Sequence, residues 1–277
     1  MAYLNEGATS LAAANWSDST GFADNATLEI KYPFGDGSPV TAGLDQSGLT
    51  EGIDSLDISA GARGQIGNNG TSLEVDADSA TSDYVRNRGN VTLYLAASGD
   101  DDLIQNFDFG GRSRNFLTDG TFTNITGDGG ELTVTESAVV TNFYAAGGSG
   151  VIKYNSTEIT TAVITGGTWT IERGVNTLYV GEGARVIYDP DDSVSHTGNT
   201  LDISGGVIDW RFGAIPTINA RGGQIDFRNA RATFTPGGTA FNVFGTRIME
   251  GTGLVSLTNV SYAGAWQRVP GGLMQPL

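Results

Sequence analysis

The sequence predicts an all-β protein of the β-solenoid type, a single-stranded right-handed parallel β-helix. Three observations predict this class: abundant glycine, apolar residues that alternate with polar ones, and a degenerate repeat of about 18 residues. Glycine accounts for 41 of 277 residues, against ~7% in an average protein. With only 7 prolines, no Gly-X-Y period and 39% hydrophobic residues, the surplus indicates neither collagen nor disorder.

The repeat is clearest in three segments that superpose without gaps on a pair of glycines. They are residues 162–171 (AVITGGTWTI), 201–210 (LDISGGVIDW) and 218–227 (INARGGQIDF). Counted from the first glycine, apolar residues occupy positions −4, −2, +3 and +5 in all three. A period of two places these side chains on one face of each strand, and the glycines permit a tight bend between strands. We expect the leading glycines Gly166, Gly205 and Gly222 to need φ above zero.

Weaker copies extend the pattern, with leading glycines at positions 110, 127, 147, 166, 181, 205, 222 and 237. A unit of about 18 residues cannot bury its apolar face alone, so it must stack on its neighbours. We therefore expect roughly ten coils between about residues 55 and 260, each rising by ~4.8 Å. A β-sandwich or jelly roll is the alternative, because three Asp-Gly pairs, at 36–37, 119–120 and 128–129, are typical of hairpin turns.

The chain divides into residues 1–50, an extended N-terminal arm or cap, residues 51–260, the β-helix, and residues 261–277, a short C-terminal tail. The first segment has no glycine-centred repeat but carries the aromatic residues Trp16, Phe22, Tyr32 and Phe34. The tail contains two prolines and a Gly-Gly pair, which argue against a regular strand, with Trp266 as an anchor. A solenoid needs protected ends, because an open terminal coil exposes unpaired strand edges.

Charge and composition exclude several classes of function. The 31 acidic and 15 basic residues give a net charge of −16, which disfavours both nucleic acid and anionic membranes as partners. The absence of cysteine excludes disulfides and thiol chemistry. No run approaches the ~18 apolar residues of a membrane span, and the N-terminus lacks the pattern of a secretory signal.

Isolated chemical signals do not add up to a catalytic or metal site. His196 is the only histidine, and its neighbours Ser193 and Ser195 lie too close in sequence to complete a triad. The aspartate clusters at 100–102 and at 189, 191 and 192 match no calcium-loop pattern. We expect no catalytic residue, no metal and no cofactor.

Several aspartates fall at repeat positions, Asp57 and Asp202 before the glycines and Asp209 and Asp226 after them, and nothing in the sequence singles out one pair. Asp209 and Asp226 both fall at position +4, so they are expected to stack on neighbouring coils, a distance at which a glycosidase pair is possible. Arg211, Arg221 and Arg228 lie in adjacent repeats. They form either a stripe that pairs with a second subunit or a ladder with Asp209 and Asp226 within the chain.

The aromatic-bearing segment AAANWSDSTGFADNATLEI, the phrase LDQSGLTEGIDSLDI, and repeats such as AVITGGTWTI and LDISGGVIDWR carry a resemblance to a known class. Over most of its length the chain resembles virion structural proteins of tailed bacteriophages that are built as parallel β-helices. This class includes capsid decoration (cement) proteins and some tail spikes. Similar Thr/Gly-rich repeats also occur in bacterial adhesins.

The resemblance implies a homotrimer seated on the outer surface of a virion, where it binds the major capsid protein and stabilises the shell. It transfers no catalytic residue, so no enzymatic activity is expected. We expect Trp16, Phe22, Tyr32 and Phe34 to face the capsid, and Trp266 to contact the capsid or the trimer. The alternative is a tail spike, fibre or adhesin that binds, or also cleaves, host surface glycans.

Overall fold

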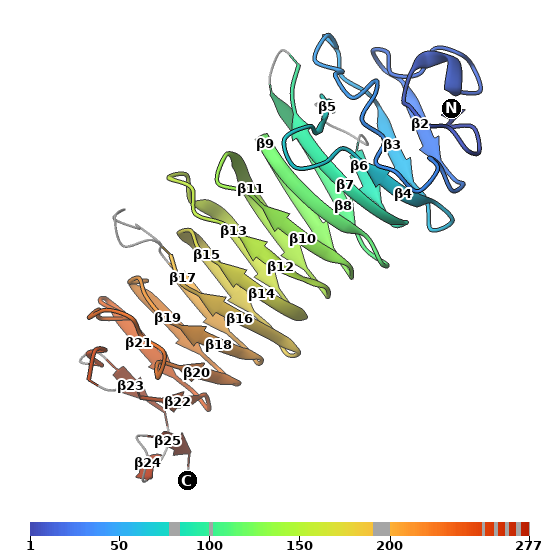
Figure 1. Cartoon of the computed structure of the whole chain (residues 1–277). Helices are drawn as coiled ribbons and strands as arrows, with labels where there is room; N and C mark the ends of the chain where they lie inside the picture. Colours follow the sequence, from blue (N-terminus) through green and yellow to red (C-terminus); the bar gives the residue numbers. More distant parts are fainter. Residues whose placement is uncertain are drawn as a thin grey trace. The chain divides into compact units, whose positions relative to one another are not determined.

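The computed structural model describes residues 1–77, 84–99, 102–190, 200–250, 253–257 and 260–263, and the backbone of 266–269 and 273–276. Across these residues the chain is all-β, with one short 3-10 helix, η1 (Ala13–Asn15). The strands stack as parallel coils of a β-solenoid with about 9 turns (Figure 1). The predicted fold class is confirmed, and the parallel pairing excludes the β-sandwich and the jelly roll.

The chain forms two compact units, Met1–Asn142 and Phe143–Leu277. The strands of unit 1 are β1 (Ala2–Tyr3), β2 (Thr27–Ile30), β3 (Ser55–Ile58), β4 (Arg63–Ile66), β5 (Leu73–Val75), β6 (Tyr84–Asn87), β7 (Asn90–Ala97), β8 (Leu103–Phe109), β9 (Arg114–Gly127) and β10 (Glu131–Val134). β11 (Ala138–Ala145) includes the boundary between the units.

Unit 1 contains two parallel ladders. One runs β1–β2–β3–β6–β8–β9, and the other runs β4–β7–β9–β10 with β5 also paired to β7. β9 belongs to both ladders because it bends at Asp119-Gly120, where Gly120 has a φ of +79°. This Asp-Gly pair is therefore a corner of a coil and not the hairpin turn that the alternative fold required.

Residues 1–50 lie on the solenoid as part of its first coils. Beyond β1 and β2, three isolated parallel bridges join this segment to later coils, through Pro33, Val40 and Asp45. Leu4 bridges to Trp16 in the antiparallel sense, and the Ser17 N–H donates to the Tyr3 carbonyl. The chain around Trp16 thus covers the edge of β1, as a cap must do to prevent edge-to-edge association.

Unit 2 repeats the two-ladder arrangement. Its strands are β12 (Ser149–Ile152), β13 (Ile159–Ile164), β14 (Gly167–Ile171), β15 (Val175–Val180), β16 (Ala184–Tyr188), β17 (Thr200–Ile203), β18 (Val207–Trp210), β19 (Thr217–Ala220), β20 (Gln224–Asp226), β21 (Ala240–Val243), β22 (Arg247–Met249), β23 (Val260–Tyr262), β24 (Trp266–Val269) and β25 (Leu273–Pro276). The odd-numbered strands β13 to β23 form one parallel ladder, and the even-numbered strands β12 to β22 form the other.

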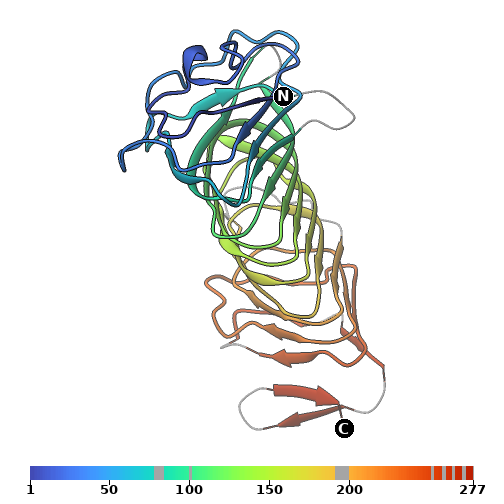
Figure 2. The ribbon, with the colours of Figure 1, turned by 90° about the vertical axis from the view of Figure 1, so that its right-hand side faces the viewer.

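The C-terminal tail differs from the expectation of an irregular segment. β24 and β25 form an antiparallel pair, and β25 adds to β22, the last parallel strand of its ladder (the red hairpin beside the C label in Figure 2). Pairing with β22 satisfies backbone groups that an open edge would leave free. Pro276 is tolerated because it stands at the end of β25, where a missing N–H costs little.

The predicted core is confirmed position by position. The twelve alternating apolar residues of the three aligned segments are all 0% exposed: Ala162, Ile164, Trp169, Ile171, Leu201, Ile203, Ile208, Trp210, Ile218, Ala220, Ile225 and Phe227. Register pairs join equivalent positions on successive coils, for example Ile203 with Ala220 and Ile208 with Ile225. A coil takes 17 residues from Ile203 to Ala220 but 23 from Val180 to Ile203, so loop length varies while the strands keep their register.

The glycine corners are confirmed, but the expected location of positive φ is wrong. It is the second glycine that has positive φ, as at Gly206 with +67°. The leading glycine, Gly205, is needed for another reason: a Cβ there would lie 2.8 Å from the Glu182 Cα of the preceding coil. Contact between stacked backbones, and not backbone conformation, therefore selects glycine at the first position.

Candidate functional site

Two of the aromatic residues expected to face a partner are buried in unit 1. Trp16 is 1% exposed, donates from its indole N–H to the Leu11 carbonyl at 3.1 Å, and meets Phe22 edge to face at 5.7 Å. Phe34 is 4% exposed and packs against Gly64, where a Cβ would lie 2.9 Å from its ring. Both side chains are covered by the chain itself, so they hold the first coils together.

Tyr32 does reach the surface, and Tyr3 joins it. Their exposed fractions are 46% and 44%, and the Lys31 ammonium lies 5.8 Å from the centre of the Tyr3 ring. Lys31 also pairs with Glu29 at 2.9 Å, and this hydrogen bond, with smaller contributions from both tyrosines, raises the Lys31 pKa. We call Tyr3, Lys31 and Tyr32 the tyrosine patch. In the sequence, Tyr3 stands between the apolar residues Ala2 and Leu4, which the structure buries. Since strand side chains alternate between faces, this position predicts that Tyr3 points outward.

Several residues singled out in the sequence fall beyond the structural description. Trp266 lies in β24, but its side chain is not among the described ones. His196, both nearby serines, and the aspartates at 100, 101, 191 and 192 lie outside the described residues. Within the described ranges, no group of three or more metal-binding side chains comes together.

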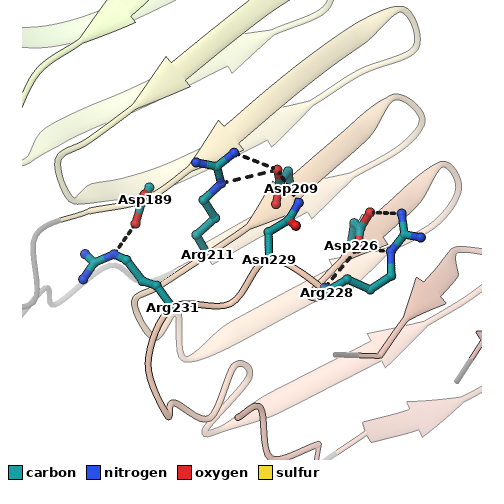
Figure 3. A network of polar contacts seen from close by, with 7 residues as sticks. All are labelled: Asp189, Asp209, Arg211, Asp226, Arg228, Asn229 and Arg231. Carbon is teal, nitrogen blue, oxygen red and sulfur yellow. Dashed lines mark hydrogen bonds and ion pairs between the residues drawn. The ribbon is translucent and has the colours of Figure 1, made fainter. Parts of the chain in front are cut away.

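The aligned aspartates form the best-defined polar cluster of unit 2 (Figure 3). Asp209 of β18 and Asp226 of β20 are register partners on neighbouring coils, and they are 4% and 7% exposed. The predicted stack is therefore confirmed. One Asp209 oxygen accepts hydrogen bonds from Arg211 at 3.2 Å and from Asn229 at 3.0 Å.

The partners of this cluster come from the chain itself. Arg228 donates to Asp226 through Nε at 2.9 Å, through Nη2 at 2.7 Å and through its own backbone N–H at 3.0 Å. Of the two arrangements considered for the arginines, the ladder within the chain is thus confirmed for Arg211 and Arg228. Asn229 is the member that the sequence analysis missed, because it lies in an irregular turn and not at a repeat position.

One further arginine ties the same turn to an earlier coil. Arg231 donates to a carboxylate oxygen of Asp189 (Figure 3). Through Nη2 it also donates to the Pro190 carbonyl at 2.6 Å. Its guanidinium also lies 4.6 Å from the centre of the Phe212 ring. The cluster therefore fastens the turn after β20 to the ends of β16 and β18, which is a structural task.

The electrostatics of the cluster oppose acid catalysis. The hydrogen bonds from the Arg228 side chain, more than any other cause, hold the Asp226 pKa below its usual value. A glycosidase pair needs one carboxyl group that keeps its proton and donates it. A carboxylate held ionised by a forked guanidinium does not meet that requirement, so the cluster is suited to binding coils together.

This lowered pKa predicts how stability depends on pH. Because the folded state holds Asp226 below its unfolded pKa of ~3.9, the group stabilises the fold above about pH 4, and that contribution is lost as the pH falls through the folded value. In urea titrations the stability gap between wild type and Asp226→Asn should be widest near pH 6 and close toward pH 2. Asp102→Asn, at an exposed position, is the control and should follow the wild-type curve. A difference in unfolding free energy between wild type and Asp226→Asn that stays constant with pH would contradict the lowered pKa of Asp226.

Unit 1 contains a cavity of about 560 Å³ whose lining is polar and acidic. Hydroxyl groups form one part of its wall: Ser72 and Thr118 share a hydrogen bond at 2.7 Å, and Thr135 donates to the Thr118 carbonyl at 2.8 Å. Three carboxylates, of Glu74, Asp102 and Asp119, also line it. No arginine, lysine or histidine is among the lining residues that the structure describes. We call it the acidic pocket.

Charge is divided very unequally between the two units. Unit 1 has 21 acidic and 6 basic residues, a net charge of −15, whereas unit 2 has 10 acidic and 9 basic residues, a net charge of −1. Nearly all of the −16 therefore belongs to unit 1. Long-range attraction of a cationic surface therefore acts mainly through the charges of unit 1.

Comparisons with protein-family profiles, with curated proteins and with solved structures gave no match to this chain. In the part of the chain that the structure describes, no helix is long and apolar enough to span a membrane.

Proposed function

We propose that the chain is a structural protein of a bacteriophage virion, a head decoration (cement) protein. As a homotrimer it binds the outer surface of the major capsid protein and stabilises the shell. The resemblance of its repeats to phage β-helical proteins supports this function. The close-packed interior of each unit also supports it, because stacked coils hold their outer side chains on a fixed backbone.

The observation that carries the proposal is the tyrosine patch on the first coil. Tyr3 and Tyr32 are exposed large aromatic residues in the segment that the resemblance assigns to capsid contact. Tyrosine supplies a large contact area at low cost in conformational entropy and is enriched in binding hot spots. In a trimer three such patches act together, so weak single contacts give firm attachment through effective concentration.

The glycan-cleaving alternative is less well supported. The pair that the structure brings together, Asp209 and Asp226, accepts hydrogen bonds from Arg211, Asn229 and Arg228, and Asp226 is held ionised. Depolymerisation of host surface polysaccharide by the purified protein, lost in Asp226→Asn, would support that alternative instead.

The proposal is tested by reconstitution on phage heads that lack the protein. Wild-type protein should sediment with the heads and raise the temperature at which they release DNA. Tyr3→Ala combined with Tyr32→Ala should reduce the bound amount at least about tenfold, the effect of losing a hot spot of ~1.4 kcal/mol or more.

Tyr144→Ala is the matched control, since Tyr144 is also an exposed tyrosine (38%) but lies in unit 2. It should bind like wild type. Equal binding by wild type, the double variant and Tyr144→Ala would show that the tyrosine patch does not contact the capsid. If wild type does not bind, the decoration function is contradicted.

A further inference from the structure

The outer face of the even-numbered ladder in unit 2 carries two exposed arginines outside the polar cluster. Arg185 of β16, Val207 of β18, Gln224 of β20 and Arg247 of β22 are successive register partners, so they form one column along the ladder. Arg185 and Arg247 are exposed, and neither is in an ion pair among the described residues. At ~4.8 Å per coil the two stand about 14 Å apart.

Partly exposed apolar side chains lie beside these arginines. The adjacent column of the same ladder includes Ile187 and Met249, on either side of the two aspartates, and Val207 lies in the arginine column itself. Arginines among apolar side chains are the composition of a binding surface more than of a solvated one. We call this surface, defined by Arg185, Val207, Ile187, Arg247 and Met249, the arginine face.

The arginine face is cationic on an acidic protein. Asp209 and Asp226 form ion pairs with Arg211 and Arg228, and Arg185 acts on Asp226 without an ion pair, so the two charges of Arg185 and Arg247 are in excess. Unit 2 as a whole has a net charge of only −1, so little repulsion opposes an acidic partner there. The partner that this face fits therefore presents carboxylates at a spacing of a few coils.

The acidic pocket of unit 1 presents such carboxylates. Glu74 of β5, Ala96 of β7 and Asp119 of β9 are successive register partners, so the two carboxylates stand two coils, or roughly 10 Å, apart over a small alanine. Neither carboxylate is in an ion pair among the described residues. The pocket thus has the open volume and the unneutralised charge that guanidinium groups require. Its carboxylates stand two coils apart, against three coils for the arginines.

We propose that the arginine face of one copy binds the acidic pocket of a second copy, with Arg185 and Arg247 as the cations and Glu74 and Asp119 as the anions. The two surfaces differ, so the contact is heterologous: it closes into a ring where the rotation permits and otherwise continues as a chain. Closure after three copies would give the homotrimer of the proposed function, and the inference deepens that function by assigning the subunit contact.

Sedimentation velocity of the full chain provides the test. Wild type should self-associate at low salt and dissociate progressively as NaCl rises from about 0.05 to 0.5 M, because the Debye length shrinks from roughly 14 to 4 Å. Arg185→Glu with Arg247→Glu should weaken association at least about tenfold, and so should Glu74→Arg with Asp119→Arg, since each places like charges together. An equimolar mixture of the two double variants should associate again, through the restored pairs.

The matched control is Arg63→Glu with Arg112→Glu, which changes the net charge equally at two exposed arginines of unit 1 and should leave association unchanged. Circular dichroism checks that each variant is folded. If a charge reversal unfolds, Glu74→Gln with Asp119→Asn gives the same readout by neutralisation. The inference is overturned if wild type is monomeric, if both double variants associate as strongly as wild type, or if their mixture stays monomeric.

The outcome is separable from that of the decoration function. Protein that is monomeric in solution but binds heads overturns the subunit contact alone. Protein that associates as described but never binds heads overturns the decoration function alone.

Discussion

Replacing Trp210 by alanine should lower the free energy of unfolding by about 3–5 kcal/mol, the usual range for a fully buried tryptophan. Trp210 is 0% exposed, and its indole N–H donates to the carbonyls of Phe212 and Gly213, both at 2.9 Å. Its ring centre lies 5.7 Å from that of Tyr188 and 5.8 Å from that of Phe227. The change therefore leaves a cavity at the centre of an aromatic stack that spans three coils.

Urea titration followed by circular dichroism measures the effect. Phe244→Ala is the matched control, because Phe244 belongs to the same unit but is 52% exposed. Its replacement should change the unfolding free energy by less than about 0.5 kcal/mol, as at ordinary surface positions. Similar losses for the two variants would show that Trp210 does not lie in a packed core.

Replacing Gly206 by valine should destabilise the protein by at least about 3 kcal/mol, from backbone strain and overpacking together. Gly206 has a φ of +67°, which a β-branched residue adopts only with strain. A Cβ there would also lie 2.4 Å from the Gly181 carbonyl oxygen and 2.6 Å from that of Ala184. These atoms belong to the backbone of the preceding coil, so relief requires the stacked coils to separate.

The control for this corner is Gly238→Val, in the same unit. Gly238 is exposed, has no positive φ, and a Cβ there would meet nothing within 4 Å. It should therefore unfold within about 0.5 kcal/mol of wild type. Equal tolerance at Gly206 and Gly238 would mean that glycine is not required by the stacking of the coils.

The second half of the chain was predictable because its repeat is gapless. Aligning three segments on their glycine pairs placed twelve residues in the core and Asp209 beside Asp226, and both placements hold. The alignment could not say which glycine of each pair has positive φ. Which glycine has positive φ depends on the direction in which the chain leaves the strand and on the distance to the preceding coil. The sequence of a single repeat indicates neither.

The N-terminal segment was harder to predict because its coils have no glycine repeat. Buried aromatic residues of a cap and exposed aromatic residues of a docking arm produce the same composition, so Trp16 and Phe34 could not be told from Tyr32 by residue type. The bridge between Leu4 and Trp16 and the bridge between Pro33 and Arg63 bring Trp16 and Phe34 against the first coils. This pairing between distant residues distinguishes them from the exposed Tyr32. The strands β24 and β25 were missed because their pairing depends on the distant edge of β22.

Mass spectrometry of virions, purified on a density gradient from lysates of the phage proposed to encode the chain, tests whether the chain is a component of the virion. We expect peptides of the chain in full heads, in copy numbers comparable with a set of capsid symmetry sites, and we expect their loss from heads stripped of surface proteins. Full heads that are infectious and contain no peptide of the chain would contradict it.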